Sequence, residues 1–477
     1  MKINKKIIFV LFQTSIFIAA CEKFVDIPKP GTQVLTAEVF RNNETATSVV
    51  HGIYGEMIIN GASSYYTALL TGLSGDEIDY PSNDDEYGYF MNAINPDNNA
   101  YGMDYWASAY SYIVRANAIF NGCSESQTLH PDVKRQLMGE ALFIRAYWYF
   151  YLVNLYGKVP LALGTDYKVN MVLSRASENE VYEQIINDLK AAQDYLSTDY
   201  VSSNSLTPAE DRIRPNRACA TALLARVYLY RDRFTEAEEL ANSLIDNAVY
   251  VIEPLERVFL RSSKEAIWHM AQPTPNLTNI NVVEPSKFIL LYAPSVSHQT
   301  ALNTELINAF EAGDQRMIHW IGNYIDSTSS HPIVYYFPYK YKVREGSNPK
   351  EYTMIFRLSE QYLIRAEARA RLGRYPEALS DLNVIRKRAG LPLLNADDTQ
   401  LTEANLLKLI MRERQVELFT EQGHRWLDLK RSHNLELIMA KVSAQKNTTW
   451  KPGMELWPLP TSEILNNSHL DQNPGYN

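Results

Sequence analysis

The chain has 477 residues, of which 46% are hydrophobic, and it carries 55 acidic against 46 basic side chains, a formal net charge of −9. This length and composition predict a large globular protein with a sizeable core. The acidic balance argues against nucleic acid as a partner, because nucleic-acid binding needs a basic face. After Cys21 only Cys123 and Cys219 remain, too few for a disulfide framework.

The first twenty residues have the pattern of a secretory signal. Three lysines stand within the first six residues, an apolar run follows, and the segment ends in small residues. The sequence Ile18-Ala19-Ala20-Cys21 resembles the bacterial lipoprotein box, in which cleavage precedes the cysteine and the thiol is then lipidated. The alternative is a secreted protein with a stray cysteine. We predict a signal peptide over 1–20 and lipidation of Cys21.

The residues after Cys21 bear on where the protein resides. Acidic Glu22 and Asp26 resemble the surface-export signal of some Gram-negative lipoproteins. No second apolar stretch approaches the ~18 residues that a membrane helix needs, so we expect contact with the membrane through the lipid alone. Two or three acyl chains anchor stably, whereas one anchors weakly. The predicted location is the outer membrane, with the body at the cell surface.

The N-terminal part of the body begins with a proline-containing tether over 24–33, followed by amphipathic helices over 44–59 and 65–73. The stretch 75–102 then shows neither helical nor strand periodicity, and it contains many Asp and Asn residues and four tyrosines. A loop of this length is usually functional or disordered. Its aromatic content argues against disorder.

Helices are predicted over 103–120, 133–155 and 178–196, and a helix–turn–helix unit over 358–389. Three residues of that unit share one helix face: Leu363, Ala366 and Ala370. Gly373 suits the left-handed position after a helix, and Pro376 suits the first turn of the next helix.

The same unit recurs at 217–245. Three residues repeat in register, since Arg233, Glu236 and Ala237 match Arg374, Glu377 and Ala378. A partial third copy lies at 144–146 inside a long helix. Units of this tetratricopeptide (TPR) type cannot bury their faces alone and must stack on one another. Within this repeat Cys219 is predicted to be a small buried residue.

The remaining chain is read as an irregular excursion over 248–350 with short β-like runs at 265–270 and 333–339, a helix over 402–421 and a loop-like tail. We predict one mostly α-helical domain over 21–477, built as a TPR-like superhelix. The TPR-like units lie within about 103–247 and 353–431. The irregular, loop-rich ligand-binding half with short β-strands covers about 74–102 and 248–350.

Specific motifs near the C-terminus point to a family. They are MRERQVELFTEQGHRWLDLKR over 411–431 and LWPLPTSEILNNSHLDQNPGY over 456–476. Together with the lipoprotein box, the FVDIP start and WASAYSYIVRAN around Trp106 and Arg115, they resemble the SusD/RagB family of outer-membrane nutrient-binding lipoproteins, of the starch-utilisation type. The resemblance covers nearly all of the mature chain.

The resemblance implies a superhelix of about four TPR units that binds glycans, or sometimes peptides, at the cell surface. Its members pair with a SusC-like TonB-dependent barrel that imports the ligand, and they are not enzymes. The predicted function is therefore glycan capture for such a transporter, without cofactor or metal. A peptide-binding lipoprotein of the same import system and a surface glycoside hydrolase are the alternatives.

Sugar-binding sites combine flat aromatic faces with Asn, Asp or Arg side chains for the hydroxyl groups. The 75–102 loop supplies both, and the irregular half adds two aromatic candidates. The predicted ligand contacts are Asp76, Tyr80, Tyr87, Tyr89, Asn92, Tyr292 and Trp320. The other interpretation is that the loop tyrosines pack back on the scaffold. The family resemblance places ligands near these regions without fixing a residue.

Other chemistry has weaker signals. A glycosidase needs two carboxylates about 5–5.5 or 6.5–9.5 Å apart, which Asp76, Glu77 and Asp79 could offer, as could almost any acidic loop. The acidic run at 84–86 lacks the glycine and spacing of an EF-hand. In the C-terminal motif, the pairs Arg414–Glu417 and Arg425–Asp428 are spaced i, i+3 and can meet on a helix surface. We interpret these residues as fixing helix packing rather than contacting a ligand.

Replacing Cys21 by alanine removes the predicted attachment point. We expect the variant in the soluble fraction and the wild type with the outer membrane, measured by fractionation and by the lipid mass on the N-terminal peptide. A variant that stays membrane-bound, with no lipid mass on either form, contradicts the anchor. Protease treatment of intact cells tests surface exposure separately.

Overall fold

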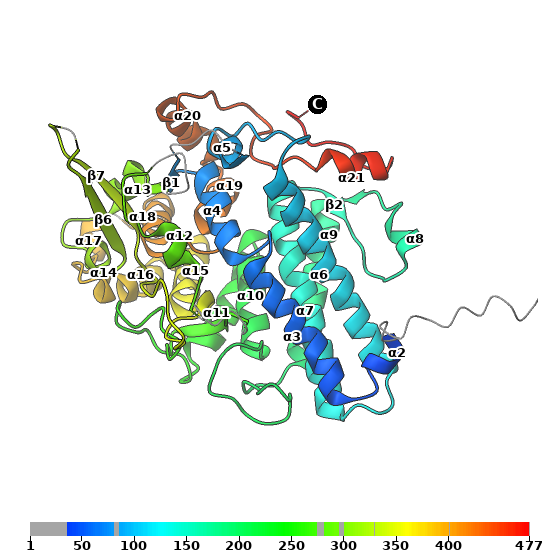
Figure 1. Cartoon of the computed structure of the whole chain (residues 1–477). Coiled ribbons are helices and arrows are strands. Elements are labelled where there is room, and N and C mark those ends of the chain that lie inside the picture. The colour runs from blue at the N-terminus through cyan, green and yellow to red at the C-terminus, as the bar shows by residue number, and fades with distance from the viewer. Residues whose placement is uncertain are drawn as a thin grey trace, which may run out of the picture.

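The computed structural model describes residues 36–80, 85–273, 281–294, 300–328, 330–399 and 401–476. Cys21 and the predicted tether lie outside these ranges. Helices make up most of the described chain, and its strands are short and paired in two-stranded sheets (Figure 1). The mostly α-helical fold is the one that the sequence predicts. No described helix combines the length and the apolar character that crossing a membrane requires.

The N-terminal half is almost entirely helical. Its helices are α2 (Thr36–Val39), α3 (Asn43–Ile59), α4 (Ser64–Ser74), α5 (Asp85–Phe90), α6 (Ala100–Glu125), α7 (Pro131–Tyr156), α8 (Tyr167–Asn170), α9 (Glu178–Tyr195), α10 (Arg217–Tyr230) and α11 (Phe234–Ile245). Local sequence explains their ends: Asn42, Ser63 and Ser177 cap α3, α4 and α9 with side-chain oxygens.

The C-terminal half returns to helices after the irregular segment. Its helices are α12 (Glu284–Phe288), α13 (Thr304–Ala309), α14 (Arg316–His319), α15 (Leu358–Arg371), α16 (Tyr375–Arg388), α17 (Ala396–Thr399), α18 (Glu403–Glu417), α19 (His424–Arg431), α20 (Leu435–Gln445) and α21 (Thr461–Asn466). In the predicted TPR-like unit, Leu363, Ala366 and Ala370 are fully buried, and Gly373 is left-handed with φ 76°. The shared apolar face and the turn at Gly373, both suggested by the sequence, thus account for the packing of α15 on α16.

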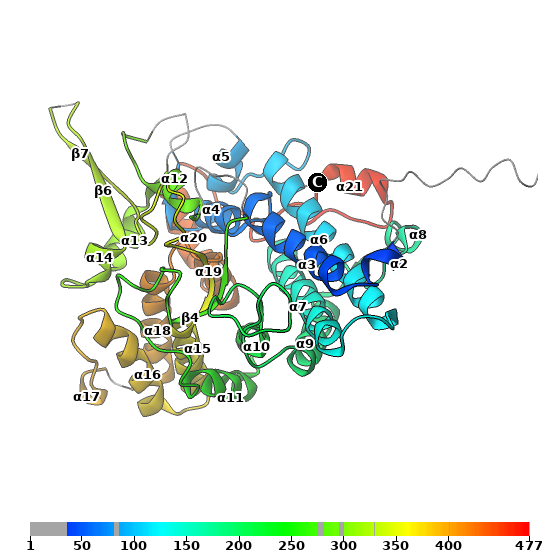
Figure 2. The same cartoon turned by 60° about the horizontal axis from the view of Figure 1, so that its bottom comes forward.

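The helices stack in sequence order into a curved layer. α7 packs against both α6 and α9, and contacts then continue through α10, α11, α15, α16 and α18. Figure 2 shows α11, α15 and α16 along one edge, with α6, α7 and α9 at the other end. Such stacking buries a face of each unit against its neighbour. α7 is buried nearly all round, which accounts for its run of aromatic residues.

Four antiparallel strand pairs belong to the loops between helices. The pairs are β1 (Ile78–Asp79) with β5 (Ala301–Leu302), β2 (Val159–Pro160) with β3 (Arg175–Ala176), β4 (Ala266–Met270) with β8 (Thr353–Arg357), and β6 (Ile321–Asp326) with β7 (Ile333–Pro338). β8 runs directly into α15, so the β4–β8 pair joins the irregular segment to the scaffold. The β6–β7 hairpin projects from the body (Figures 1 and 2).

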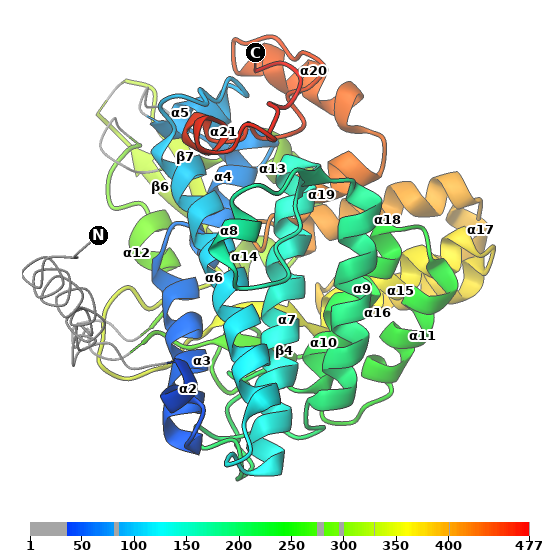
Figure 3. The ribbon, with the colours of Figure 1, turned by 90° about the vertical axis from the view of Figure 1, so that its right-hand side faces the viewer.

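Two stretches are more regular than the sequence predicts. The 75–102 segment contains β1, α5 and the start of α6, so it is not one continuous loop. The expected helix over 402–421 ends at Glu417, and α19, α20 and α21 follow within the predicted tail. Gly423, with φ 71°, begins α19 after a sharp turn. The tail crosses the end of α7 (Figure 3), where the Trp457 N–H donates to the Leu155 carbonyl at 2.7 Å.

Both cysteines of the body are buried and unpaired. Burial raises the pKa of each thiol, Cys123 and Cys219, to about 12. Cys219 is fully buried in α10, as predicted. Trp106 on α6 is also buried.

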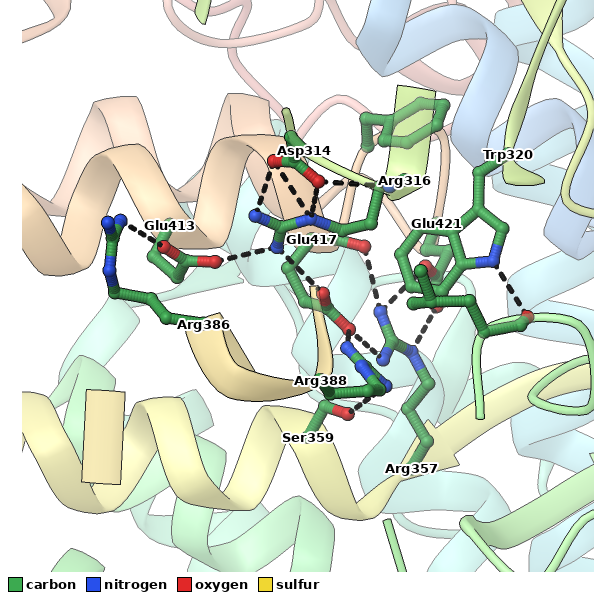
Figure 4. Close-up of polar contacts among 12 residues, drawn as sticks. Asp314, Arg316, Trp320, Arg357, Ser359, Arg386, Arg388, Glu413, Glu417 and Glu421 are labelled. Carbon is green, nitrogen blue, oxygen red and sulfur yellow. Dashed lines mark hydrogen bonds and ion pairs between the residues drawn. The ribbon is translucent and has the colours of Figure 1, made fainter. Parts of the chain in front are cut away.

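A buried network of ion pairs joins the TPR-like helices to the irregular segment (Figure 4). Glu417 at the end of α18 binds three guanidinium groups, those of Arg316, Arg357 and Arg388. Glu265, beside β4, binds Arg357 at 3.0 Å and Arg388 at 3.1 Å. All five side chains are at most 6% exposed. Burial alone would raise the pKa of Glu417, but the three arginines hold it well below its usual value.

The two arginines of the C-terminal motif have other partners than the i, i+3 spacing suggests. Arg414 pairs with Asp428 (Nε–Oδ2 2.6 Å), and Arg425 pairs with Asp76 (Nη2–Oδ2 2.6 Å). The turn after α18 folds α19 back, which brings Asp428 to Arg414. The carboxylate of each pair is at most 5% exposed, so these are interior contacts. The i, i+3 pairing is wrong, whereas the interpretation that these residues fix helix packing agrees with the structure.

Glu417→Gln tests the network. Three buried guanidinium groups lose their shared counter-charge, so we expect the free energy of unfolding to fall by about 3–5 kcal/mol in denaturant titration. The control is Glu236→Gln, whose partner Arg233 is about one-third exposed and whose loss should cost only ~0.2–1 kcal/mol. Equal effects of the two substitutions would show that the buried network contributes no more than a surface pair.

Candidate functional site

The start of the predicted binding loop is tied to three C-terminal elements. Asp76 forms its ion pair with Arg425 of α19. Asp79 accepts a hydrogen bond from Asn303, next to β5, at 2.5 Å. The Lys446 ammonium, just after α20, donates to the carbonyls of Leu73 and Gly75 at 2.6 and 2.7 Å. The backbone over 73–79 is therefore fixed by side chains from far along the chain.

Burial shifts the pKa values of the ionisable side chains in this region. Desolvation, reinforced by repulsion from Asp76, raises the pKa of Glu77 to about 8. Desolvation lowers the pKa of Lys446 to about 7, although Asp79 and Asp76 act against the shift. Burial alone would raise the pKa of Asp76, but the Arg425 guanidinium holds it below its usual value. Glu77 is thus largely protonated at neutral pH, while Asp76 is a charged partner in a closed pair.

Further along the loop, Tyr89 and Asn92 face the interior. Tyr89 is fully buried, with its ring edge-on to Trp457 at 4.9 Å between centroids. Its hydroxyl accepts a hydrogen bond from Asn99 at 3.0 Å. Asn92 is left-handed with φ 52° and donates from Nδ2 to the Ser74 carbonyl at 3.1 Å. Both side chains pack on the scaffold, and for Tyr89 this is the other interpretation of the loop.

Trp320 is also a structural residue. It is 1% exposed, its indole N–H donates to the Leu255 carbonyl at 2.9 Å, and the Lys340 ammonium lies 5.0 Å from its ring. The apolar cluster beneath the hairpin encloses it, so its flat face is not available to a ligand in this structure. Tyr80 is only 7% exposed. Of the predicted contacts, Tyr87 is partly exposed and Tyr292 is half exposed.

A group of partly exposed aromatic rings lies where α4, α5 and α6 meet. Tyr65 and Tyr66, in the first turn of α4, have ring centroids 5.0 Å apart, and Tyr66 lies 5.4 Å from Tyr101 at the start of α6. Tyr87 and Phe90 of α5 stack at 6.0 Å. We call these five residues the aromatic platform. α5 packs against both α4 and α6, so the three helices that carry these rings are neighbours.

Sequence reasoning missed Tyr65 and Tyr66 because it assigned them to an amphipathic helix. The available signal was two adjacent tyrosines in the first turn of a short helix. Side chains there lie at the helix end and do not join the buried stripe. Phe288 of α12, which is buried, packs against Tyr65 at 5.4 Å and supports the platform from below.

The residues present do not suggest a metal centre. Among the described residues, no cluster of three or more His, Cys, Asp or Glu side chains could hold an ion. The acidic side chains at 84–86 lie outside the described part of the structure. The chemistry that the region offers is stacking on aromatic faces, with hydrogen bonding at their edges.

Comparison with known proteins links both halves of the chain to one group. A family model described as SusD family matches residues 291–476, and one described as starch-binding associating with outer membrane matches residues 41–229. SusD-like protein P2 of Formosa agariphila is 27% identical over 427 residues, which cover 80% of this chain and 82% of that protein.

Solved structures share the fold. A SusD superfamily protein from Bacteroides vulgatus superposes with a TM-score of 0.76 at 18% identity, covering 91% of this chain and 99% of that one. Surface glycan-binding protein A from Bacteroides fluxus superposes with a TM-score of 0.71 at 22% identity, again covering 91% and 99%. At these identities the likeness concerns the fold alone.

Single alanine substitutions test whether a loop tyrosine is buried, as Tyr89 is, or partly exposed, as Tyr87 is. Tyr89→Ala removes a buried ring and should lower the free energy of unfolding by about 3–5 kcal/mol. Tyr87→Ala, two residues away but partly exposed, should change it by less than ~1 kcal/mol. Thermal and denaturant melts of both variants measure this. If Tyr87→Ala destabilised the protein as much as Tyr89→Ala, the Tyr87 ring would be a core residue and would leave the platform.

Proposed function

Because this chain belongs to the SusD/RagB family, we propose that it is a lipid-anchored protein of the outer membrane, exposed at the cell surface, that captures a glycan and hands it to a SusC-like TonB-dependent transporter. Residues 21–477 form one ligand-binding domain in this proposal. Starch in the description of one family model and glycan in the name of the Bacteroides fluxus protein support the choice of ligand class.

The observation that carries the proposal is the aromatic platform. Tyr65, Tyr66 and Tyr101 form a continuous run of partly exposed rings. Flat ring faces suit the apolar side of a pyranose, and phenolic hydroxyls can exchange hydrogen bonds with sugar hydroxyls. The platform rests on the rigid ends of α4 and α6, and recognition groups are commonly held by a rigid scaffold in this way.

The arrangement of carboxylates supports capture without cleavage. A glycosidase needs two carboxyl groups that face the same bond. Asp76 is closed in its pair with Arg425, Asp79 is bonded to Asn303, and Glu77 is 2% exposed. None of these groups is presented with a partner carboxylate to a passing polysaccharide, which weighs against the hydrolase alternative.

The peptide alternative has one specific observation in its favour. Among the described strands, β6 and β7 pair only with each other. Because β5 packs against β7, the edge of β6 is the place where an extended peptide would add as a strand. Ile325 and Val334, directly opposite each other in the register, are 54% and 44% exposed. Strand addition would place a peptide on the projecting hairpin and leave the platform unused.

The placement of the chain start supports a role at the membrane surface. The described chain begins at α2, which lies far from α5 in all three views (Figures 1 to 3). An anchor that precedes α2 would hold that end of the molecule and leave the platform accessible to ligand and transporter. In the proposed function, the bound glycan is then released into the barrel of the transporter.

Binding can be tested with purified protein and soluble starch or laminarin, by affinity electrophoresis and titration calorimetry. We expect binding to one of them, and the double variant Tyr66→Ala/Tyr101→Ala should weaken it. With about 1 kcal/mol per stacked ring, the loss should be about 30-fold. The matched control is Tyr375→Ala, a partly exposed tyrosine of α16, which should bind as the wild type does.

The same mixtures test for catalysis. Chromatography of the polysaccharide after hours of incubation should show no shortened products. Steady release of sugars that disappears on changing Asp76 or Asp79 would make the protein a hydrolase. Binding that is insensitive to the platform variant would place the glycan elsewhere on the protein.

A further inference from the structure

A cavity opens between α6, α8 and α21, and it shares no lining residue with the aromatic platform. Its volume is about 640 Å³, within the range of small-ligand sites. Figure 3 shows α8 and α21 beside α6 on one face of the molecule. The C-terminal tail closes one side of this cavity, and the segment between β2 and β3 closes the other.

Aromatic rings form two sides of this α6–α8–α21 cavity. Trp106 and Tyr110, one turn apart on α6, have centroids 4.8 Å apart at an angle of 45°. Both are held in place, since Trp106 packs edge-on against Tyr156 at 5.0 Å and the Tyr110 hydroxyl donates to the Pro160 carbonyl at 2.8 Å. Tyr167, the first residue of α8, is 70% exposed. The cavity thus has one aromatic wall that is fixed by its contacts, and one exposed ring, that of Tyr167.

Polar side chains complete the lining, and they are at least partly exposed to solvent. The carboxylate of Glu463 and the amide of Asn466, both on α21, make no hydrogen bond or ion pair with any described residue. Asn170 uses its Nδ2 to bond the Gly164 carbonyl at 3.1 Å, which leaves its side-chain oxygen open. Aromatic faces combined with accessible carboxylate and amide groups are what a sugar-binding site requires.

We propose that the α6–α8–α21 cavity is a second saccharide-binding site, specific for a neutral pyranose unit. The inference rests on the proposed glycan-binding function and extends it. The Tyr167 ring stacks on the apolar face of the sugar, and Glu463 and Asn466 bind its hydroxyl groups. The carboxylate of Glu463 disfavours an anionic sugar, because like charges repel in a confined space.

Two sites on one chain have a consequence for polymers. A polysaccharide that reaches both sites binds the second one intramolecularly, and its overall affinity can exceed that of either site by about 10²–10⁴. A short oligosaccharide fills each site independently. The cavity would therefore make the protein selective for long chains over short fragments of the same sugar.

The test is calorimetry with neutral hexasaccharides, namely maltohexaose, laminarihexaose, cellohexaose and mannohexaose. For the sugar that binds, we expect two molecules per wild-type chain. Tyr167→Leu, which keeps apolar area but removes the flat ring, and Glu463→Ala should each weaken one site about 10-fold, and the double variant should leave one molecule per chain. Tyr167→Phe keeps the ring and should bind nearly as the wild type does. Thermal melts check that each variant is folded.

The outcomes separate this inference from the function on which it rests. One bound molecule per wild-type chain, lost in Tyr66→Ala/Tyr101→Ala but unchanged in Tyr167→Leu, overturns the second site and leaves the proposed function standing. Two bound molecules that Tyr167→Leu does not affect also overturn it and place the second saccharide elsewhere on the protein. If no hexasaccharide binds the wild type, both proposals fail.

Discussion

The carboxylate of Glu417 is the contact on which the arrangement of the two halves depends. Three guanidinium groups in a protein interior would repel one another and cost free energy to bury without a shared counter-ion. Arg316 comes from α14, Arg357 from the end of β8 and Arg388 from the end of α16. The irregular half has two small apolar clusters, and Trp268 of β4 enters the main core. Ion pairing of defined geometry therefore acts together with apolar packing to set its position on the helical layer.

The TPR-like unit was predictable because its information is local. Helical periodicity, Gly373 after one helix and Pro376 in the next all act within a few residues, and the structure follows them. The partner of Glu417 was not predictable in this way. Its i, i+3 spacing from Arg414 suggested a local pair, whereas its actual partners Arg316 and Arg357 lie 101 and 60 residues away in the chain. Only the tertiary fold brings such residues together.

In the candidate site, too, the sequence did not show which side chains the fold would bury, even for residues within one helical turn. The composition of the 75–102 stretch correctly marked it as unusual, but without knowledge of α5 its tyrosines were equivalent. On a helix, residues two apart point in nearly opposite directions, so Tyr89 enters the core while Tyr87 stays partly exposed. The prediction that Trp320 contacts ligand failed for a different reason. An aromatic residue in an irregular segment suggested an exposed ring, but that segment has a core of its own.

The burial of Cys123 and Cys219 bears on the export that we propose for this chain. Thiolates, not thiols, attack disulfides and oxidants, and with pKa values of about 12 the folded protein holds almost no thiolate at neutral pH. Outside the cytoplasm, where thiols are readily oxidised, both cysteines are vulnerable only before folding. The helical layer then serves as their redox protection, and an exported protein can retain two unpaired cysteines without forming cross-links.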